Sequence, residues 1–206
     1  MPIILYKEVS PMVRVIVWEI TEDFDYLSSQ LHPRDLNEVG ESFLENKKLE
    51  TAATRLASAN LMKSIGVNYE GIQKDEFGKP HIPNNPNIHV SISHAFPLAG
   101  AIIDTSGPTG IDIEKPGKQI LRIKHKFLSD DEMDFCGDDQ NLLTQAWCAK
   151  EVLYKIHGRK QLSFKKQLSV TFKTDQLIEG VITNGTNEKY ELQSIFIKDY
   201  HIIFKH

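Results

Sequence analysis

Apolar residues recur along this chain with the spacings of both strands and helices. Residues 13–18 are β-branched and aromatic, which is typical of a strand, and Ile88 to Ser93 alternates strictly between apolar and polar residues. Lys47 to Ile65 carries leucine and alanine at spacings of three and four, and Gly66 follows directly. This pattern predicts a helix that ends at the glycine and has a small apolar face suited to lying close to a sheet.

Further segments of both kinds divide the chain into two halves around Ser106-Gly107-Pro108. In the first half we expect helices over Asp23–Leu31 and Arg34–Asn46, a hairpin from Asn68 to Ile82 that turns at residues 75–78, and a strand over Leu98–Ile103. In the second half we expect a strand over Gly110–Glu114, helices over Lys118–Phe127, Ser129–Phe135 and Asp138–His157, and strands over Leu168–Phe172, Glu179–Thr183, Tyr190–Ile197 and His201–Phe204. Each half runs from strand through helices to strands, which predicts an α+β fold of two similar halves, residues 1–105 and 106–206.

Composition and charge narrow the class of protein. The 206 residues carry a formal net charge of -4, which argues against a general nucleic-acid binder. The two cysteines, Cys136 and Cys148, match neither a zinc motif nor a disulfide framework. The N-terminal residues do not form a secretion signal, and the chain has no apolar run long enough to span a membrane. We therefore expect a protein of the reducing cytoplasm.

Two carboxylates lie on the strand predicted at the start of the second half. Asp112 and Glu114 are two residues apart, so their side chains project from the same face of the strand. Hard oxygen ligands of this kind suit Mg²⁺, which commonly takes one or two carboxylates together with phosphate oxygens. When the pair is taken alone, the acidic face of a half-exposed edge strand is the simpler explanation.

A second group of candidate residues lies on the last predicted helix. Trp147, Glu151 and Lys155 recur every four residues and therefore share one stripe of the helix. The large indole indicates that the stripe faces inward or into a cleft, where a buried glutamate needs a partner such as a metal ion. The alternative is a surface ion pair between Glu151 and Lys155, worth only about 0.3–0.5 kcal/mol.

Polar and basic residues in the first half are candidates for phosphate binding. Ser91 and Ser93 share a strand face, and His94 follows at the end of the strand, where ligands often meet a sheet. A Ser–His hydrolase is disfavoured because neighbouring residues on a strand point to opposite faces and the chain has no Gly-x-Ser-x-Gly motif. Arg55 lies beside the small apolar face of the long helix, where its guanidinium could fork onto a phosphate or a carboxylate.

Four of these segments, in this order, resemble the 4'-phosphopantetheinyl transferase superfamily: Gly78-Lys79-Pro80, Ser91-Ile92-Ser93-His94, Gly110-Ile111-Asp112-Ile113-Glu114, and Trp147-Cys148-Ala149-Lys150-Glu151 with Lys155. The length and the apparent duplication resemble the larger, monomeric, surfactin-synthetase-activating type. The resemblance implies two α+β halves in a pseudo-two-fold arrangement with the active site in the cleft between them. It also implies transfer of the 4'-phosphopantetheine group of coenzyme A to a serine of an apo acyl or peptidyl carrier protein, with release of 3',5'-adenosine bisphosphate.

The resemblance also implies roles for individual residues. The metal, Mg²⁺ with Mn²⁺ as a possible substitute, would be held by Asp112, Glu114 and Glu151. Asp112, Glu151 and Lys155 would be the catalytic residues, with Glu151 as general base and Lys155 assisting the leaving group. Coenzyme A would be contacted by Arg55, Lys74, Lys79, Ser93, His94, Lys150 and Lys155, with Lys48 as a weaker candidate. The alternative is a non-catalytic paralogue that binds coenzyme A or a carrier protein, and its expected signature is the loss of one acidic ligand.

Overall fold

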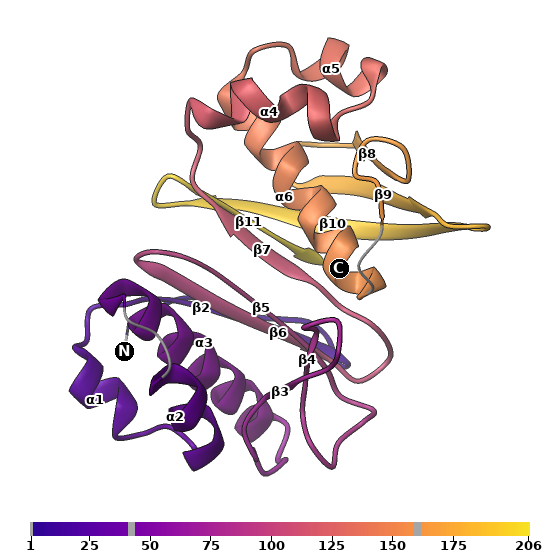
Figure 1. The fold of residues 1–206 in the computed structure, drawn as a ribbon. Coiled ribbons are helices and arrows are strands. Elements are labelled where there is room, and N and C mark those ends of the chain that lie inside the picture. Colours follow the sequence, from indigo (N-terminus) through magenta and orange to yellow (C-terminus); the bar gives the residue numbers. More distant parts are fainter. Residues whose placement is uncertain (1, 41–43, 159–161) are drawn as a thin grey trace. The chain divides into compact units, whose positions relative to one another are not determined.

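Helices and antiparallel sheets make up both halves of this protein in the computed structural model, which describes residues 2–40, 44–158 and 162–206 (Figure 1). The α+β class predicted from the sequence is confirmed. The chain divides into two compact units, residues 1–109 and 110–206, so the boundary lies between Thr109 and Gly110. This boundary lies a few residues after the one predicted between residues 105 and 106.

Unit 1 is built on a sheet of six antiparallel strands in the order β1-β2-β6-β5-β4-β3. Neighbouring strands in the centre of the sheet are paired in continuous register, for example Val13 with Asp104 and Ser93 with Gly100. The strands are β1 (Ile3–Ser10), β2 (Val13–Glu19), β3 (Gln73–Lys74), β4 (Pro80–His81), β5 (His89–Ala95) and β6 (Leu98–Asp104).

The long helix α3 (Glu45–Ser64) lies along this sheet (Figure 1). The shorter helices α1 (Phe24–Ser28) and α2 (Pro33–Gly40) pack against α3. The buried face of α3 is rich in small and branched side chains, as the leucine and alanine spacing predicted. The core of the unit combines this face with residues of β2, β5 and β6, including Ile16, Trp18, Val90 and Ala101. Gly66 follows the helix with a φ of 72°, a conformation that favours glycine.

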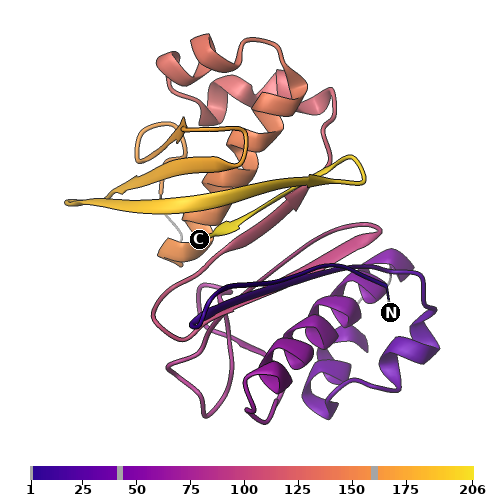
Figure 2. The same cartoon turned by 180° about the vertical axis from the view of Figure 1, so that it is seen from behind.

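Unit 2 contains a five-stranded antiparallel sheet in the order β7-β11-β10-β9-β8 (Figure 2). One helix, α6 (Gln140–His157), packs along one face of this sheet, and α4 (Gln119–Phe127) lies against α6. The shorter α5 (Asp130–Cys136) begins with the predicted capping box, in which Ser129 and Glu132 each accept a backbone N–H of the other. The strands are β7 (Ile111–Glu114), β8 (Leu168–Phe172), β9 (Leu177–Thr183), β10 (Asn187–Ile197) and β11 (Tyr200–Lys205).

Helix α6 is well defined at both ends and lies very close to β7. Asp139 caps its first turn by accepting the backbone N–H groups of Asn141 and Leu142, and Gly158 ends it in the left-handed conformation with a φ of 71°. Gly110 has no side chain, and a Cβ built there would lie 2.6 Å from the carbonyl oxygen of Val152. The backbone of α6 therefore passes directly over the start of β7.

The structure differs from the sequence predictions at the N-terminal end of unit 1. Strand β1 was not predicted, because Lys7 and Glu8 interrupt its apolar residues and much of this edge strand is exposed. The helix expected over Asp23–Leu31 is shorter, since α1 covers Phe24–Ser28, and Pro33 begins the second helix, α2, which is described as far as Gly40. The rest of the predicted Arg34–Asn46 helix includes residues 41–43, which lie outside the described residues.

Both cysteines, Cys136 and Cys148, are buried free thiols. Among the residues that the structure describes, no helix combines the length and the apolar character needed to cross a lipid bilayer.

Replacing Gly110 with alanine tests the close approach of α6 to β7. A methyl group 2.6 Å from the Val152 carbonyl cannot fit without backbone movement, so Gly110→Ala should lower the free energy of unfolding by roughly 1–3 kcal/mol or more. Urea denaturation followed by circular dichroism measures the change. Gly107→Ala is the control, since a Cβ at Gly107 meets no atom within 4 Å and should have little effect.

A buried histidine on β11 makes stability depend on pH. Burial lowers the pKa of His201 from 6.5 to about 4, and neither ring nitrogen has a hydrogen-bond partner among the described residues. The unfolded chain takes up a proton on this imidazole near pH 6.5, whereas the folded protein does so only near pH 4. The free energy of unfolding therefore keeps its full value above pH 6.5 and falls by about 3 kcal/mol as the pH is lowered towards 4. In His201→Phe, urea midpoints measured from pH 7 to pH 4 should fall less than in the parent protein. Equal slopes would contradict the assignment.

Candidate active site

Four of the predicted site side chains meet where α6 packs against β7. Asp112 and Glu114 occupy alternate positions of β7, and both are bonded by side chains of α6. The Lys155 Nζ donates to Asp112 Oδ1 and to the backbone oxygen of Ile111, each at 2.8 Å. The indole Nε1 of Trp147 donates to Glu114 Oε1 at 3.2 Å. The stripe expected from the spacing of Trp147 and Lys155 therefore faces the acidic strand.

Glu151 lies on α6 one turn after Trp147 and one turn before Lys155, and its side chain is partly buried. Burial raises the pKa of Glu151 to about 7, and the negative charge of Asp112 adds to the rise. Burial also raises the pKa of Glu114, again with a contribution from Asp112. The three carboxylates therefore act on one another electrostatically, and added positive charge near them would stabilise their ionised forms.

Cys148 is a member of this site that sequence reasoning missed. Its thiol is completely buried and is hydrogen-bonded to the Asp112 side chain, and burial raises the pKa of the thiol well above its usual value. The neutral S–H group is thus a donor to the carboxylate. A signal was present, because Cys148 and Lys155 are seven residues apart and share one face of the helix.

Asp112, Glu114 and Glu151 supply oxygen donors of the kind that Mg²⁺ takes, and the pKa values of Glu114 and Glu151 are raised by burial and by the charge of Asp112. The ligand group is not assembled, however: within the described ranges no three histidine, cysteine, aspartate or glutamate side chains are placed to hold one ion. The ammonium of Lys155 bonds Asp112, and the indole of Trp147 bonds Glu114. A cation binding at these carboxylates would compete with Lys155 for Asp112.

Lys150, expected to contact coenzyme A, has a different environment. Its side chain is completely buried, and its Nζ donates to Glu132 Oε2 at 2.6 Å and to the backbone oxygens of Phe127 and Phe164 at 2.7 and 3.0 Å. An ammonium group has three N–H donors, and these acceptors use all of them. The structure therefore does not support a coenzyme A contact for Lys150, because its charge is neutralised inside unit 2.

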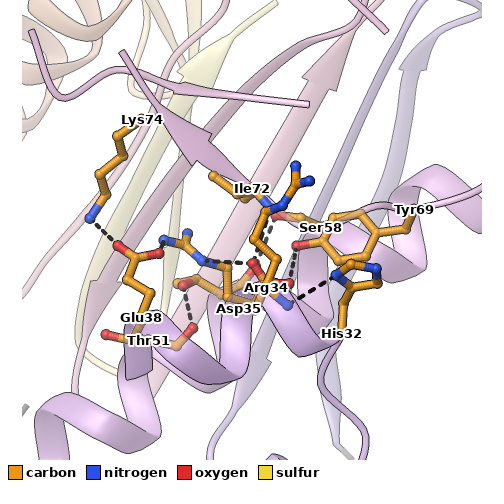
Figure 3. A network of polar contacts seen from close by, with 11 residues as sticks. His32, Arg34, Asp35, Glu38, Thr51, Ser58, Tyr69, Ile72 and Lys74 are labelled. Carbon is orange, nitrogen blue, oxygen red and sulfur yellow. Dashed lines mark hydrogen bonds and ion pairs between the residues drawn. The ribbon is translucent and has the colours of Figure 1, made fainter. Parts of the chain in front are cut away.

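Figure 3 shows a network of polar side chains in unit 1, among them Asp35, Glu38, Tyr69 and Lys74. Arg55 is buried and forms ion pairs with Glu38 and with Asp35, whose Oδ1 lies 3.4 Å from Arg55 Nε. Glu38 also pairs with Lys74. Asp35 is completely buried and accepts a hydrogen bond of 2.8 Å from the Tyr69 hydroxyl. This group is a charge network that joins α2, α3 and the start of β3.

This network changes the interpretation of Arg55 and Lys74. Arg55 is 1% exposed. The sequence left open whether its guanidinium binds a phosphate or a carboxylate, and the structure shows that it binds carboxylates. Its predicted contact with coenzyme A is not supported, since the guanidinium is covered and neutralised. Lys74 is half-exposed and shares Glu38 with Arg55, so its role as a phosphate contact stays a prediction. Glu38 and Asp35 were missed, because on the sequence they are two ordinary acidic residues of a short helix.

Ser93 and His94 end β5 beside the first turns of α3. Ser93 is buried, and His94 lies between two charged residues of the helix. Its Nδ1 is 3.2 Å from Glu50 Oε2, and its Nε2 is 3.1 Å from Lys47 Nζ. The structure therefore adds Lys47 and Glu50 to the polar group predicted from the strand. Lys48 points elsewhere, with its Nζ 5.4 Å from the centre of the Phe24 ring.

Lys79 lines a cavity of unit 1 that has a volume of about 590 Å³. Burial lowers the pKa of Lys79. The wall also includes polar, ring and aliphatic side chains of the β3–β4 hairpin, of β5 and of the segment between them, among them Gln73, Asp75, Pro80, His81, Ile82, Asn84, Ile88 and His89, together with Pro108. The cavity therefore combines the ammonium of Lys79 and the carboxylate of Asp75 with histidine, proline and isoleucine side chains.

Comparison with known proteins identifies relatives of this chain by sequence. Residues 108–204, nearly all of unit 2, match the family model described as the 4'-phosphopantetheinyl transferase superfamily. A 4'-phosphopantetheinyl transferase of Bacillus subtilis is 32% identical over 137 residues, which cover 64% of this chain and 59% of that relative. The Sfp 4'-phosphopantetheinyl transferase of Bacillus subtilis strain 168 is 37% identical over 89 residues, which cover 41% of this chain and 39% of the relative.

These matches define the class to which the site belongs: residues 108–204 match the 4'-phosphopantetheinyl transferase superfamily, and the chain is similar to transferases of that class. The resemblance seen in the four motifs is thereby confirmed at the level of the superfamily. The aligned segments span about three fifths or less of the relatives' own lengths.

Replacing Arg55 distinguishes a structural cation from a ligand contact. Arg55→Met leaves Asp35 and Glu38 without their buried partner, so the free energy of unfolding should fall by about 3 kcal/mol in urea denaturation without any ligand. Lys63→Met, at an exposed site of the same helix, should change it little. If Arg55→Met kept its stability and lost only affinity for coenzyme A, the sequence prediction would be right and the structural role wrong.

Proposed function

We propose that this protein transfers the 4'-phosphopantetheine group of coenzyme A to a serine of an apo carrier protein. The observation that carries the proposal is the group of Asp112, Glu114, Glu151 and Lys155 on β7 and α6, in a part of the chain that matches the superfamily model. Carboxylates and an ammonium beside one strand are the groups needed to hold a divalent cation and a diphosphate.

In the proposed reaction the serine oxygen forms a bond to the β-phosphorus of coenzyme A. The bond from that phosphorus to the bridging oxygen breaks, and 3',5'-adenosine bisphosphate leaves with the electron pair. The serine proton passes to Glu151, directly or through a water molecule. A transfer of this kind depends mainly on positioning and on stabilising charge, so the protein's part is to orient the two reactants.

The remaining residues have complementary roles in the proposal. Asp112, Glu114 and Glu151 would hold Mg²⁺, which when bound supplies positive charge at the phosphoryl oxygens. Lys155, whose ammonium bonds Asp112 in the free protein, would turn to the departing phosphate. Exchange of Lys155 from a carboxylate to a phosphate keeps its charge paired before and after the ligand binds.

Unit 1 would contribute to binding of the coenzyme A nucleotide. The cavity beside Lys79 supports this part of the proposal, since it joins a lysine to proline and histidine side chains. Ser93, His94 and Lys74 remain the other proposed contacts, while Arg55 and Lys150 are left out because their charges are buried in ion pairs. A cytoplasmic location and a monomeric state stay predictions, as does the choice of Mg²⁺ over Mn²⁺.

The alternative is a paralogue that binds coenzyme A or a carrier protein without transfer. It would be favoured if the site had lost a carboxylate, and in this chain Asp112, Glu114 and Glu151 are all present. The alternative and the main proposal share the binding step, so an assay of binding alone does not separate them. An assay of the modified carrier protein separates them.

A mass measurement tests the proposal directly. Protein, coenzyme A, Mg²⁺ and an apo carrier protein are mixed, and the carrier should gain the mass of one phosphopantetheine group; EDTA should abolish the gain. Asp112→Asn and Glu151→Gln should each lower the rate by about 100-fold or more, because each removes charge from the site that stabilises the transition state. A panel of carriers of the fatty-acid, polyketide, peptide-synthetase and reductase types identifies the partner.

Asp134→Asn is the matched control, since it removes an exposed carboxylate of α5 and should leave the rate unchanged. Near-normal transfer by Asp112→Asn at saturating Mg²⁺ would show that the metal assignment is wrong. Binding of coenzyme A with no transfer to any carrier would favour the non-catalytic paralogue.

A further inference from the structure

The indole of Trp147 is held between two phenylalanine rings. The Phe164 ring stacks on it, with ring centres 5.4 Å apart and planes at 21°, and the Phe127 ring meets it edge-on, with centres 5.0 Å apart and planes at 72°. These contacts leave the indole little freedom to rotate. Its Nε1 donates to Glu114 Oε1 at 3.2 Å, so the direction of this bond depends on the two rings.

The backbones of the same two phenylalanines meet at one buried cation. Lys150 Nζ donates to the carbonyl oxygen of Phe127 at 2.7 Å and to that of Phe164 at 3.0 Å. Phe127 ends α4 and Phe164 lies in the segment before β8, so these residues are far apart in the sequence and are joined by this lysine. Lys150 therefore ties together the two segments whose rings enclose Trp147.

Glu132 completes the arrangement around the cation. Its Oε2 accepts from Lys150 at 2.6 Å, and its Oε1 accepts the backbone N–H of Val170 on β8 at 2.9 Å. Lys150 is completely buried, so the carboxylate supplies the charge that keeps the ammonium stable inside the unit. The ammonium's position is thus defined by α4, α5, α6 and the segment before β8.

We propose that Lys150 is a positioning residue for Glu114. It acts through the two phenylalanine carbonyls, which set the rings that hold Trp147, whose indole in turn orients the Glu114 carboxylate. Lys150 precedes Glu151 in the chain, but its ammonium bonds Glu132, Phe127 and Phe164 inside the unit rather than the acidic side chains of β7. The inference rests on the proposed function in one respect, namely that Glu114 is a metal ligand.

A spectroscopic measurement tests the positioning without metal, substrate or activity. The protein has two tryptophans, so a two-dimensional proton–nitrogen NMR spectrum should show two indole N–H signals, and the one missing in Trp147→Phe belongs to Trp147. Lys150→Met should shift the Trp147 signal and speed its hydrogen exchange, while the Trp18 signal stays in place. A lysine that only stabilises the fold would lower the unfolding midpoint and leave the Trp147 signal unchanged.

A double-mutant cycle tests the link to Glu114. Lys150→Met and Trp147→Phe should each weaken Mg²⁺ binding, measured by calorimetry, by about 10- to 100-fold, the range typical of residues that orient a metal ligand. Because both act through one hydrogen bond, the double variant should bind Mg²⁺ about as weakly as either single variant. Effects that multiply would show independent roles and overturn the proposal.

Lys124→Met is the matched control for Lys150→Met. Lys124 also bonds a backbone carbonyl and a carboxylate, namely those of Gly137 at 2.8 Å and of Asp138 at 2.7 Å, but it lies at the surface of α4. It should change neither the Trp147 signal nor Mg²⁺ binding. If Lys150→Met does not fold, Phe164→Leu removes one ring and keeps the carbonyl, and the same two changes are expected.

The outcomes separate this inference from the proposed function. An unchanged Trp147 signal and unchanged Mg²⁺ affinity in both Lys150→Met and Phe164→Leu would overturn the positioning role, even if transfer to a carrier is observed. A shifted Trp147 signal in a protein that binds no Mg²⁺ and transfers no phosphopantetheine would support the chain from Lys150 to Trp147 and contradict the proposed function.

Discussion

The close contact between α6 and β7 determines where the charges of unit 2 lie. Because Gly110 carries no side chain, the helix backbone passes directly over the strand, and the side chains that follow on each element must meet. Asp112 and Glu114 therefore accept hydrogen bonds from Lys155 and Trp147. Burial of Glu114 disfavours its ionised form and raises its pKa, and positive charge close by offsets this effect.

Each unit contains a buried cation that is paired with carboxylates. These ion pairs have a different role from the acidic side chains Asp112, Glu114 and Glu151. Arg55 in unit 1 and Lys150 in unit 2 are each covered and each matched by carboxylates, so neither has charge to offer a ligand. Their pairs join helices to neighbouring strands and loops. By contrast, Lys155 pairs with Asp112, and the two other carboxylates of the site, Glu114 and Glu151, have raised pKa values.

Much of the site could be anticipated because it depends on local periodicity. The two-residue spacing of a strand places Asp112 and Glu114 on one face, and the spacing of a helix places Trp147, Glu151 and Lys155 on one stripe. The roles of Arg55 and Lys150 could not be anticipated in the same way. A charged residue within a motif looks the same on the sequence whether its partner is a ligand or a carboxylate such as Glu132, which is 18 positions away.

The sequence by itself determined the class of fold, most of the helices and strands, and the two faces on which the catalytic candidates lie, because short-range spacing and capping residues are sufficient for these. Tertiary structure decided which charges are available, since burial and pairing depend on segments distant in the chain. It brought Glu38 to Arg55, and it brought Phe127 and Phe164 to Lys150. Electrostatic energy depends on distance and on exclusion of water, and neither of these can be read from residue spacing alone.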